Sequence, residues 1–459
     1  MNAWLNVLRE TLGPDKVLFS AVDRVAYSFD GTFEQHLPDA VVLAESNEDV
    51  SQVLRTASYY DVPVVTRGMA SGLAGGAIPT QGGIVLSLVR MNRILEIDET
   101  NFTATVEAGV VTADLQSAVE KLGLFYPPDP SSIKQSTIGG NVACNAGGPR
   151  CLKYGVTGDY VMGLTVVLAD GRLLRTGNKS IKNVTGLNLS QLFVGSEGAL
   201  GAITEVLLRL VPKPPYARTA LAHFPRLEDA SRLVESVLRR GVVPATLELM
   251  DETAIACIED AMHLGLPLDV EAILLIECDG MDQQSVMREV ETVAGVCTEV
   301  GASRVEVAQS EEERAELWRA RRSVSPSLAR QAPNKLGEDI TVPRSAIPEA
   351  VRRLKAVSAK YGLPIVIFGH AGDGNLHPNI LFDRRDSDQW AKVGQMVGEI
   401  FLIALDLGGT LTGEHGIGTF KLPYMEAALG RTSLNVQWRI KLALDPQNIL
   451  NPGKVLPGF

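Results

Sequence analysis

Three of the chain's six histidines lie in two short C-terminal stretches. The first stretch, from Gly369 to Asn379, contains His370 and His377, and the second is Gly413-Glu414-His415-Gly416. Two imidazoles can chelate a divalent metal, and an adjoining Glu-His pair can supply a carboxylate ligand and a general base. These stretches are therefore the first candidates for chemistry.

A β-hairpin would position the two histidines. Residues 364–368 form an apolar, β-branched run, Asp373-Gly374 is a preferred two-residue turn, and residues 380–382 are apolar again. Centring the turn on Asp373-Gly374 places His370 directly opposite His377, with Cβ atoms about 4.5–5.5 Å apart. The alternatives are a polar hairpin that holds no metal and a solvated Glu-His loop.

Length and composition indicate a globular protein with two or more domains. The 459 residues are 45% hydrophobic and 21% charged. A net charge of -11 argues against nucleic-acid binding. Arg319, Arg321 and Arg322 gather next to Trp318, and this small patch suits an anionic small molecule better than a polyanion. Five scattered cysteines match no zinc or iron–sulfur spacing and predict a cytoplasmic protein.

No apolar run reaches the roughly 18 residues that a membrane span requires. The N-terminal residues form an amphipathic helical pattern without the features of a signal peptide. Any membrane contact, such as one on the inner face of the membrane, is therefore expected to be peripheral.

Short β-branched runs alternate with helical patterns in the N-terminal half. We expect strands at 41–44, 62–66, 84–88, 103–107 and 164–168, and helices at 47–60 and at 113–122, the latter capped by Thr112. The proline-rich run 211–215 ends this half.

The second half predicts an α+β domain in which helices cover an antiparallel sheet. Its expected strands are 217–223 and 273–277, and its expected helices are 227–239, 283–300, 311–330 and 347–361. The final segment, 440–459, is rich in proline and glycine and is expected to pack back on the first domain.

Three clusters of small residues stand out in the N-terminal half: 67–76, 127–148 and 195–201. The first cluster follows a predicted strand, and its glycines allow backbone N–H groups to face an anion. It matches neither the dinucleotide fingerprint nor the P-loop, so a plain glycine-rich turn is the alternative. Three such clusters in one domain favour close approach of the main chain to a large flat ligand.

These clusters resemble the FAD-binding domain of the vanillyl-alcohol oxidase / p-cresol methylhydroxylase superfamily. The hairpin and the Gly-Glu-His-Gly stretch resemble its FAD-linked 2-hydroxy-acid dehydrogenases, which include the glycolate oxidase flavin subunit, D-lactate dehydrogenases and D-2-hydroxyglutarate dehydrogenase. The resemblance implies an α+β fold with a two-subdomain FAD-binding domain (1–214). An α+β substrate or cap domain with an antiparallel sheet and the metal site (215–425) follows, and a C-terminal segment (426–459) returns to the FAD domain.

The resemblance also implies which residues bind FAD. Those of the first loop are Arg67, Gly68, Met69, Ala70, Ser71, Gly72 and Gly75. Those along the flavin and its linker are Pro128, Ser136, Thr137, Gly139, Gly140 and Asn145. Those nearer the adenine and ribose are Glu197, Gly198, Gly201 and Ile203, and Asn451 in the C-terminal ending is assigned to the cofactor as well. Relatives with covalent flavin carry histidine at the position of Ser71, so the FAD is expected to be non-covalent.

For the second domain the resemblance implies a metal, usually zinc, on His370, His377 and Glu414. His415 matches the catalytic base. The Trp-x-x-Arg match makes Arg321 the bidentate partner of the substrate carboxylate, although Arg319 and Arg322 stay open as alternatives, as does a plain exposed helix face. The further implied substrate contacts are Ser325, Lys335 and Asn379.

The implied enzyme is an FAD-linked 2-hydroxy-acid dehydrogenase or oxidase. It would convert a small D-2-hydroxy acid (glycolate, D-lactate or D-2-hydroxyglutarate class) to the 2-oxo acid, with metal assistance, hydride transfer to flavin N5 and His415 as base. The electron acceptor would be a quinone, an electron-transfer flavoprotein, an iron–sulfur subunit or oxygen, and a homodimer is compatible with the sequence. Alternatives are a non-redox flavoenzyme of the alkyl-glycerone-phosphate synthase type and a flavin-bearing electron-transfer subunit.

Overall fold

The computed structural model describes residues 2–458, and the chain forms two compact units. The first unit contains Met1–Gly147, Val156–Lys213 and Glu414–Phe459, and the second contains Gly148–Gly155 and Pro214–Gly413. The chain leaves the first unit within the proline-rich run and returns to it at Glu414. The functional domain limits given above stay predictions.

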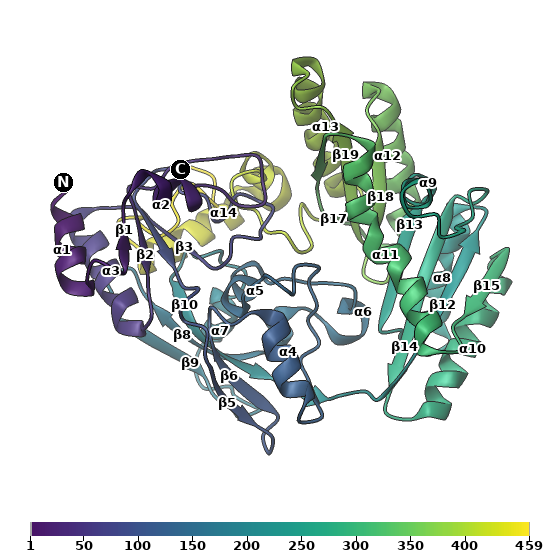
Figure 1. The fold of residues 1–459 in the computed structure, drawn as a ribbon, viewed down its shortest axis with the longest axis horizontal. Helices are drawn as coiled ribbons and strands as arrows, with labels where there is room; N and C mark the ends of the chain where they lie inside the picture. Colours follow the sequence, from purple (N-terminus) through teal and green to yellow (C-terminus); the bar gives the residue numbers. More distant parts are fainter. Residues whose placement is uncertain (1, 459) are drawn as a thin grey trace. The chain divides into compact units, whose positions relative to one another are not determined.

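A mainly parallel sheet forms one half of the first unit (Figure 1). Strand β4 pairs in parallel with both β2 and β3, while β1 pairs antiparallel with β2. Ser46 caps helix α3 by accepting the N–H of Asp49, and the helix has the bounds expected from its sequence. The elements of this half are α1 Ala3–Leu12, β1 Val17–Leu18, α2 Ala21–Ala26, β2 Ala40–Leu43, α3 Asn47–Tyr60, β3 Val64–Arg67 and β4 Ile84–Ser87.

An antiparallel sheet of order β5-β6-β10-β8-β9 forms the other half. Its strands are β5 Ile94–Asp98, β6 Thr103–Glu107, β8 Val161–Val167, β9 Leu173–Gly177 and β10 Ala202–Arg209. The accompanying elements are α4 Thr112–Glu120, β7 Leu124–Phe125, α5 Ile138–Cys144, α7 Leu189–Phe193 and β11 Val211–Pro212. The expectation that Thr112 caps α4 is wrong: the cap position is Val111, and the Thr112 hydroxyl donates to the Ser136 carbonyl at 3.0 Å.

The C-terminal segment packs on the first unit, after helix α14, Met425–Leu444. Leu450 forms a parallel bridge with Val64 at the edge strand β3. The buried Lys441 amine donates to Asp445 Oδ2 at 2.5 Å and to the Leu450 carbonyl at 2.8 Å. These bonds, together with the apolar packing of Ile449 and Leu450, hold the Pro/Gly-rich ending on the first unit.

One eight-stranded antiparallel sheet organises the second unit. Its main order is β15-β12-β14-β13-β18-β19-β16, and β17 also pairs with β19. The strands are β12 Tyr216–Phe224, β13 Thr246–Asp251, β14 Ala272–Gly280, β15 Arg304–Val307, β16 Asn334–Gly337, β17 Ile340–Thr341, β18 Ile365–His370 and β19 Asn375–Phe382.

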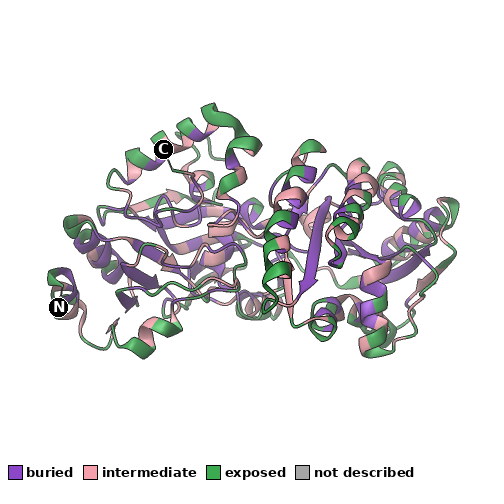
Figure 2. Ribbon diagram, turned by 90° about the horizontal axis from the view of Figure 1, so that it is seen from above, coloured by how far each residue is buried: buried purple, intermediate pink, exposed green. Residues whose placement is uncertain are grey.

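Helices cover this sheet, as the sequence predicts. Helices α9 and α11 share one apolar core with the sheet, in which Ile255 and Val324 pack with Met250, Ile273 and Leu275. Figure 2 shows buried strands and helices whose outer sides are exposed. The helices of this unit are α6 Cys151–Tyr154, α8 Leu227–Arg239, α9 Glu252–Met262, α10 Gln283–Glu299, α11 Glu311–Gln331, α12 Ile347–Tyr361 and α13 Ser387–Asp406. Between residues 2 and 458, no helix has both the length and the apolar character needed to cross a membrane.

A buried aspartate at the start of α9 gives the fold a pH dependence. Asp251 Oδ1 accepts the N–H of Ala254 at 2.9 Å, but within the described part of the chain its buried Oδ2 has no hydrogen-bond partner. Burial raises the pKa of Asp251 to about 7. The folded state therefore holds a proton that the unfolded state releases near pH 4, and stability falls as the pH rises through this window.

We expect Asp251→Asn to remove this pH dependence, because asparagine keeps the cap acceptor without a buried charge. The variant should be more stable than the parent at pH 8, by about 2 kcal/mol, and the gain should shrink as the pH falls toward 4. Urea unfolding at several pH values measures this. Asp282, which caps α10 on the surface and has a lowered pKa, is the matched control, and Asp282→Asn should lower stability at pH 8. An equal effect of Asp251→Asn at all pH values would contradict the expectation.

Candidate active site and metal centre

Strands β18 and β19 form the predicted hairpin, but with a different turn. His370 pairs with Asn375, and His377 pairs with Phe368, so the predicted direct opposition of the two histidines is wrong. Four residues, 371–374, connect the strands, and the His370 carbonyl accepts the N–H of Gly374 at 3.0 Å. Gly374 has φ +87°, and an added Cβ would lie 2.1 Å from the Val342 carbonyl oxygen. The turn is therefore shaped by the chain that packs against it.

The two histidines meet across the hairpin in a diagonal relation. His377 lies two residues beyond Asn375, the partner of His370, so both side chains project from the same face. Their Nε2 atoms lie 3.4 Å apart, and the residues are 2% and 8% exposed. A tetrahedral metal with nitrogen ligands at 2.0–2.1 Å separates those nitrogens by about 3.3 Å. The spacing of the imidazoles therefore fits a shared zinc ion.

Glu414 supplies a third ligand atom, and all three candidate atoms lie within 4.8 Å of one another. Asp339 positions the chain immediately before it: its Oδ2 accepts the N–H of Gly413 at 2.7 Å, and its Oδ1 accepts the Thr412 hydroxyl at 2.9 Å. Two imidazoles and one carboxylate form a donor set used by catalytic zinc sites. The residues present therefore fit a divalent metal.

Glu248, on β13, is a site residue that sequence reasoning missed. It has no exposed surface, and its Oε1 lies 2.6 Å from His370 Nδ1. Its Oε2 accepts Arg321 Nε at 2.7 Å. Burial acts to raise the pKa of Glu248, but His370 and Arg321 outweigh it, and the pKa lies below its ordinary value. The available signal was an acidic residue between two leucines, Leu247 and Leu249.

Arg321 is the arginine of the small basic patch that reaches the hairpin. Both its Nε and its Nη2 lie 2.7 Å from Glu248 Oε2, and its guanidinium lies 4.9 Å above the Phe368 ring centre. Arg319 instead pairs with Glu316 at the surface, and the Arg322 guanidinium lies 5.5 Å from the Trp318 ring centre. The role of Arg321 as a carboxylate partner stays a prediction, and one edge of its planar group already faces Glu248.

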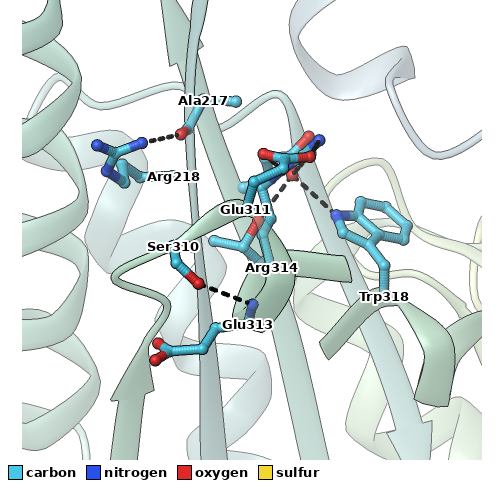
Figure 3. Close-up of polar contacts among 9 residues, drawn as sticks. Ala217, Arg218, Ser310, Glu311, Glu313, Arg314 and Trp318 are labelled. Atoms are coloured by element: carbon cyan, nitrogen blue, oxygen red, sulfur yellow. Dashed lines mark hydrogen bonds and ion pairs between the residues drawn. The ribbon is translucent and has the colours of Figure 1, made fainter. Parts of the chain in front are cut away.

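Trp318 anchors α11 one turn before Arg321. Its indole Nε1 donates to Glu277 Oε2 at 2.8 Å, and Arg314 Nη1 donates to the same oxygen at 2.8 Å. Figure 3 shows both side chains reaching from α11 toward the sheet, with Glu311 beside Arg314. Trp318 therefore holds the helix in place.

The other predicted substrate contacts lie on neighbouring elements of the second unit. The Lys335 amine donates to the Ser325 hydroxyl, and burial lowers the pKa of Lys335. Asn379 lies on β19 with its Nδ2 donating to the His377 carbonyl at 2.8 Å. Residue Gly337, two positions after Lys335, pairs with Asn379 in the sheet. The structure thus brings Ser325 and Lys335 together, and their roles toward substrate stay predictions.

The first two glycine-rich clusters meet in the first unit. An added Cβ on Gly68 would lie 2.3 Å from Thr137 Oγ1, so the loop after β3 packs tightly on the start of α5. Ala70 has φ +53°, and Thr137 caps α5 by accepting the N–H of Gly140. Buried Arg67 Nε has no hydrogen-bond partner within residues 2–458. The Arg67 donor and the adjacent glycine-rich loop, whose backbone N–H groups few side chains cover, fit an anionic group such as the FAD pyrophosphate.

The third cluster meets the C-terminal ending. Asn451 Nδ2 donates to the Glu197 carbonyl at 2.6 Å and to the Gly76 carbonyl at 3.1 Å. The buried Glu197 carboxylate accepts the N–H groups of Ile417 at 2.6 Å and Gly418 at 2.9 Å. The Glu197 side chain therefore holds the segment just after His415, while its assignment to the adenine side of FAD stays a prediction.

Several of the remaining predicted cofactor residues take part in packing of the first unit, while Met69 and Gly72 are exposed. Gly139 and Gly201 lie against Ala108 and Val166, where an added Cβ would approach within 2.5 Å of each. Ser136 lies beside Thr112, and Asn145 Oδ1 accepts the N–H of Gly158 at 2.8 Å. The positions of the others are Met69, exposed; Ser71, partly buried; Gly72, exposed; Gly75, buried; Pro128, buried; Gly198, partly buried in the turn after Glu197; and Ile203, buried in β10.

Two family profiles cover most of the chain. The profile described as FAD binding domain matches residues 38–177, and the one described as FAD linked oxidases, C-terminal domain, matches residues 213–455. The chain belongs to the FAD-linked oxidase family. The resemblance drawn from the glycine clusters and the hairpin is confirmed, and the protein is an FAD-linked oxidoreductase.

Known proteins similar to this FAD-linked oxidase include two named enzymes. The glycolate oxidase subunit GlcD of Bacillus subtilis (strain 168) is 48% identical over 449 residues, covering 98% of this chain and 95% of the relative. The D-lactate dehydrogenase of Anaerostipes hadrus is 35% identical over 425 residues, covering 91% of this chain and 89% of the relative.

A solved structure of p-cresol methylhydroxylase with substrate bound has the same fold. It is 21% identical with a TM-score of 0.84, and the match covers 98% of this chain and 96% of that chain. The predicted fold, an FAD-binding domain of this type joined to an α+β domain with an antiparallel sheet, is confirmed.

We expect His377→Ala to weaken Zn²⁺ binding by more than about 100-fold, since loss of an outer-shell partner alone costs 10–100-fold. The measurement is a titration of chelator-treated protein against a competing zinc dye. His36→Ala removes an exposed histidine of the first unit and should leave the affinity unchanged. Equal zinc affinity in the parent and in His377→Ala would place the metal elsewhere.

Proposed function

We propose that this protein catalyses the FAD-dependent, metal-assisted oxidation of a small D-2-hydroxy acid to the 2-oxo acid. The substrate would belong to the glycolate, D-lactate or D-2-hydroxyglutarate class. The supporting observation is the buried pair His370 and His377, gathered with Glu414 beside the adjacent His415, in an FAD-linked oxidase. The names of the similar proteins, a glycolate oxidase subunit and a D-lactate dehydrogenase, point to the same substrate class.

Charged groups in the second unit would bind the acid. Arg321 carries a fixed positive charge and keeps donors beyond the two that face Glu248. Lys335 and Ser325 offer a second pair of polar groups, and they would contact the part of the substrate beyond C2. Asn379, next to His377 along one face of β19, would contact the polar end of the substrate.

His415 would take the hydroxyl proton. Its segment is restrained on both sides, by the Asp339 carboxylate at Gly413 and by the Glu197 carboxylate at Ile417 and Gly418. A base held in this way loses little freedom when the substrate binds, which favours proton transfer. When bound on His370, His377 and Glu414, the metal would supply positive charge that acidifies the hydroxyl group, and non-covalent FAD would supply the two-electron acceptor at N5.

The reduced enzyme would pass its electrons to a separate acceptor, such as a quinone, an electron-transfer flavoprotein or an iron–sulfur subunit. None of the five cysteines forms a disulfide, and burial raises the pKa of Cys144 to about 12. Cys144 therefore does not supply a reactive thiol for this transfer. A cytoplasmic location, a peripheral membrane contact and a homodimer belong to the same proposal.

The test is anaerobic stopped-flow reduction of the flavin by a panel of D- and L-2-hydroxy acids. The parent protein should be reduced by at least one D-acid, and His415→Asn should slow that step by about 10²–10⁴-fold. Chelation of the metal should slow it as well, while His36→Asn should react like the parent. FAD content, read from the absorbance before mixing, separates a catalytic loss from loss of cofactor. Unchanged reduction rates in His415→Asn would refute the proposed role of His415.

A further inference from the structure

Helix α11 contacts two buried carboxylates of the sheet with one of its faces. Arg314, Trp318 and Arg321 follow one another at helical spacing of four and three residues, so they project from the same side. Arg314 and Trp318 donate to Glu277 on β14, as Figure 3 shows for the two donor residues. Arg321 donates to Glu248 on the neighbouring strand β13.

The two carboxylates differ in what else they bind. Glu277 also accepts the Thr219 hydroxyl, at 2.7 Å. The remaining partner of Glu248 is His370 Nδ1, at 2.6 Å. Glu248 thus contacts a candidate metal ligand with one oxygen and the candidate substrate arginine with the other.

We propose that Glu248 is a positioning residue that prepares His370 for metal binding and holds Arg321 against the same site. This inference rests on the metal site of the proposed function. A carboxylate can only accept hydrogen bonds, so the proton of a neutral His370 lies on Nδ1. The lone pair is then on Nε2, which faces His377 Nε2 at 3.4 Å.

The charge of Glu248 also matters. Arg321 binds one oxygen of the carboxylate whose other oxygen contacts His370. Without compensation, the fixed positive charge of Arg321 would disfavour a divalent cation on His370. Glu248 neutralises this charge at 2.7 Å, in a place with little solvent: the Glu248 side chain is 0% exposed and that of Arg321 is 11% exposed. A neutral Glu248 replacement would lose this compensation and would present a donor to either His370 or Arg321.

The same contact narrows how Arg321 can bind substrate. Because Nε and Nη2 both face Glu248 Oε2, the edge of the guanidinium that contains Nε is occupied. A substrate carboxylate would therefore meet the Nη1 end of the group. Glu248 in this way sets the orientation of two groups, one that would act on the substrate carboxylate and one that would act on its adjacent hydroxyl.

Zinc affinity of four variants tests this inference without reference to turnover. The FAD-loaded protein is stripped with a chelator and titrated with Zn²⁺ against a competing dye. We expect Glu248→Gln to weaken zinc binding by about 10–100-fold, as for other outer-shell partners of ligating histidines. Glu248→Asp, which keeps the charge but shortens the side chain, should lose less and guards against misfolding of the first variant.

Two controls separate positioning from loosening of α11. Glu277→Gln disturbs the same helix and sheet through the other carboxylate and should leave zinc affinity within about threefold of the parent. Arg321→Met removes the positive charge while Glu248 stays, so zinc affinity should not fall.

Unchanged affinity in Glu248→Gln, or equal losses in all variants, would overturn the inference and leave the metal site standing. A parent protein that binds no zinc would overturn the metal site itself and this inference with it.

Discussion

A buried carboxylate that water cannot reach must have its charge neutralised by neighbouring groups. Glu248 is such a carboxylate, and its neutralisation determines how several elements of the second unit pack. Leaving the charge of a buried acid uncompensated costs several kcal/mol, which is comparable to the net free energy of unfolding of a typical domain. Glu248 meets this requirement with Arg321 from α11 and His370 from β18, so one strand side chain fixes a helix and a hairpin relative to each other. The same contact orients the His370 ring, whose Nε2 faces His377.

The segment that carries the candidate ligand and base depends on carboxylates as well. Asp339 binds the chain at Thr412 and Gly413, and Glu197 binds it at Ile417 and Gly418. Glycines at both ends allow this close approach: an added Cβ on Gly413 would lie 2.5 Å from Thr341 Oγ1, and one on Gly418 would lie 1.8 Å from the Ala74 carbonyl oxygen. Glu414 and His415 thus lie in a segment that backbone bonds of neighbouring residues hold on both sides.

Local patterns predicted much of the fold, because helix ends and buried strands are set by nearby residues. Helices α3, α8 and α12 have the expected bounds, and the glycine clusters and the hairpin indicated the family. The pairing of His370 was predicted wrongly because the turn depends on Gly374 packing against Val342, a contact that no local pattern encodes. Glu248 was missed for the same reason, since its partners are 73 and 122 positions away in sequence.

The contacts of α11 explain why Trp318 and Arg321 are separated by three positions. Trp318 is tied to Glu277 and Arg321 to Glu248, and these acids stand on adjacent strands. The three-residue interval therefore sets the distance along α11 between Trp318 and Arg321, and this distance matches the spacing of the adjacent strands that carry the two acids. One inserted residue between them would turn Arg321 by about 100° around the helix axis, away from its acid. Substitutions at the residues around this interval would leave the spacing intact. A change in the length of the interval would instead prevent Trp318 and Arg321 from reaching both acids at once.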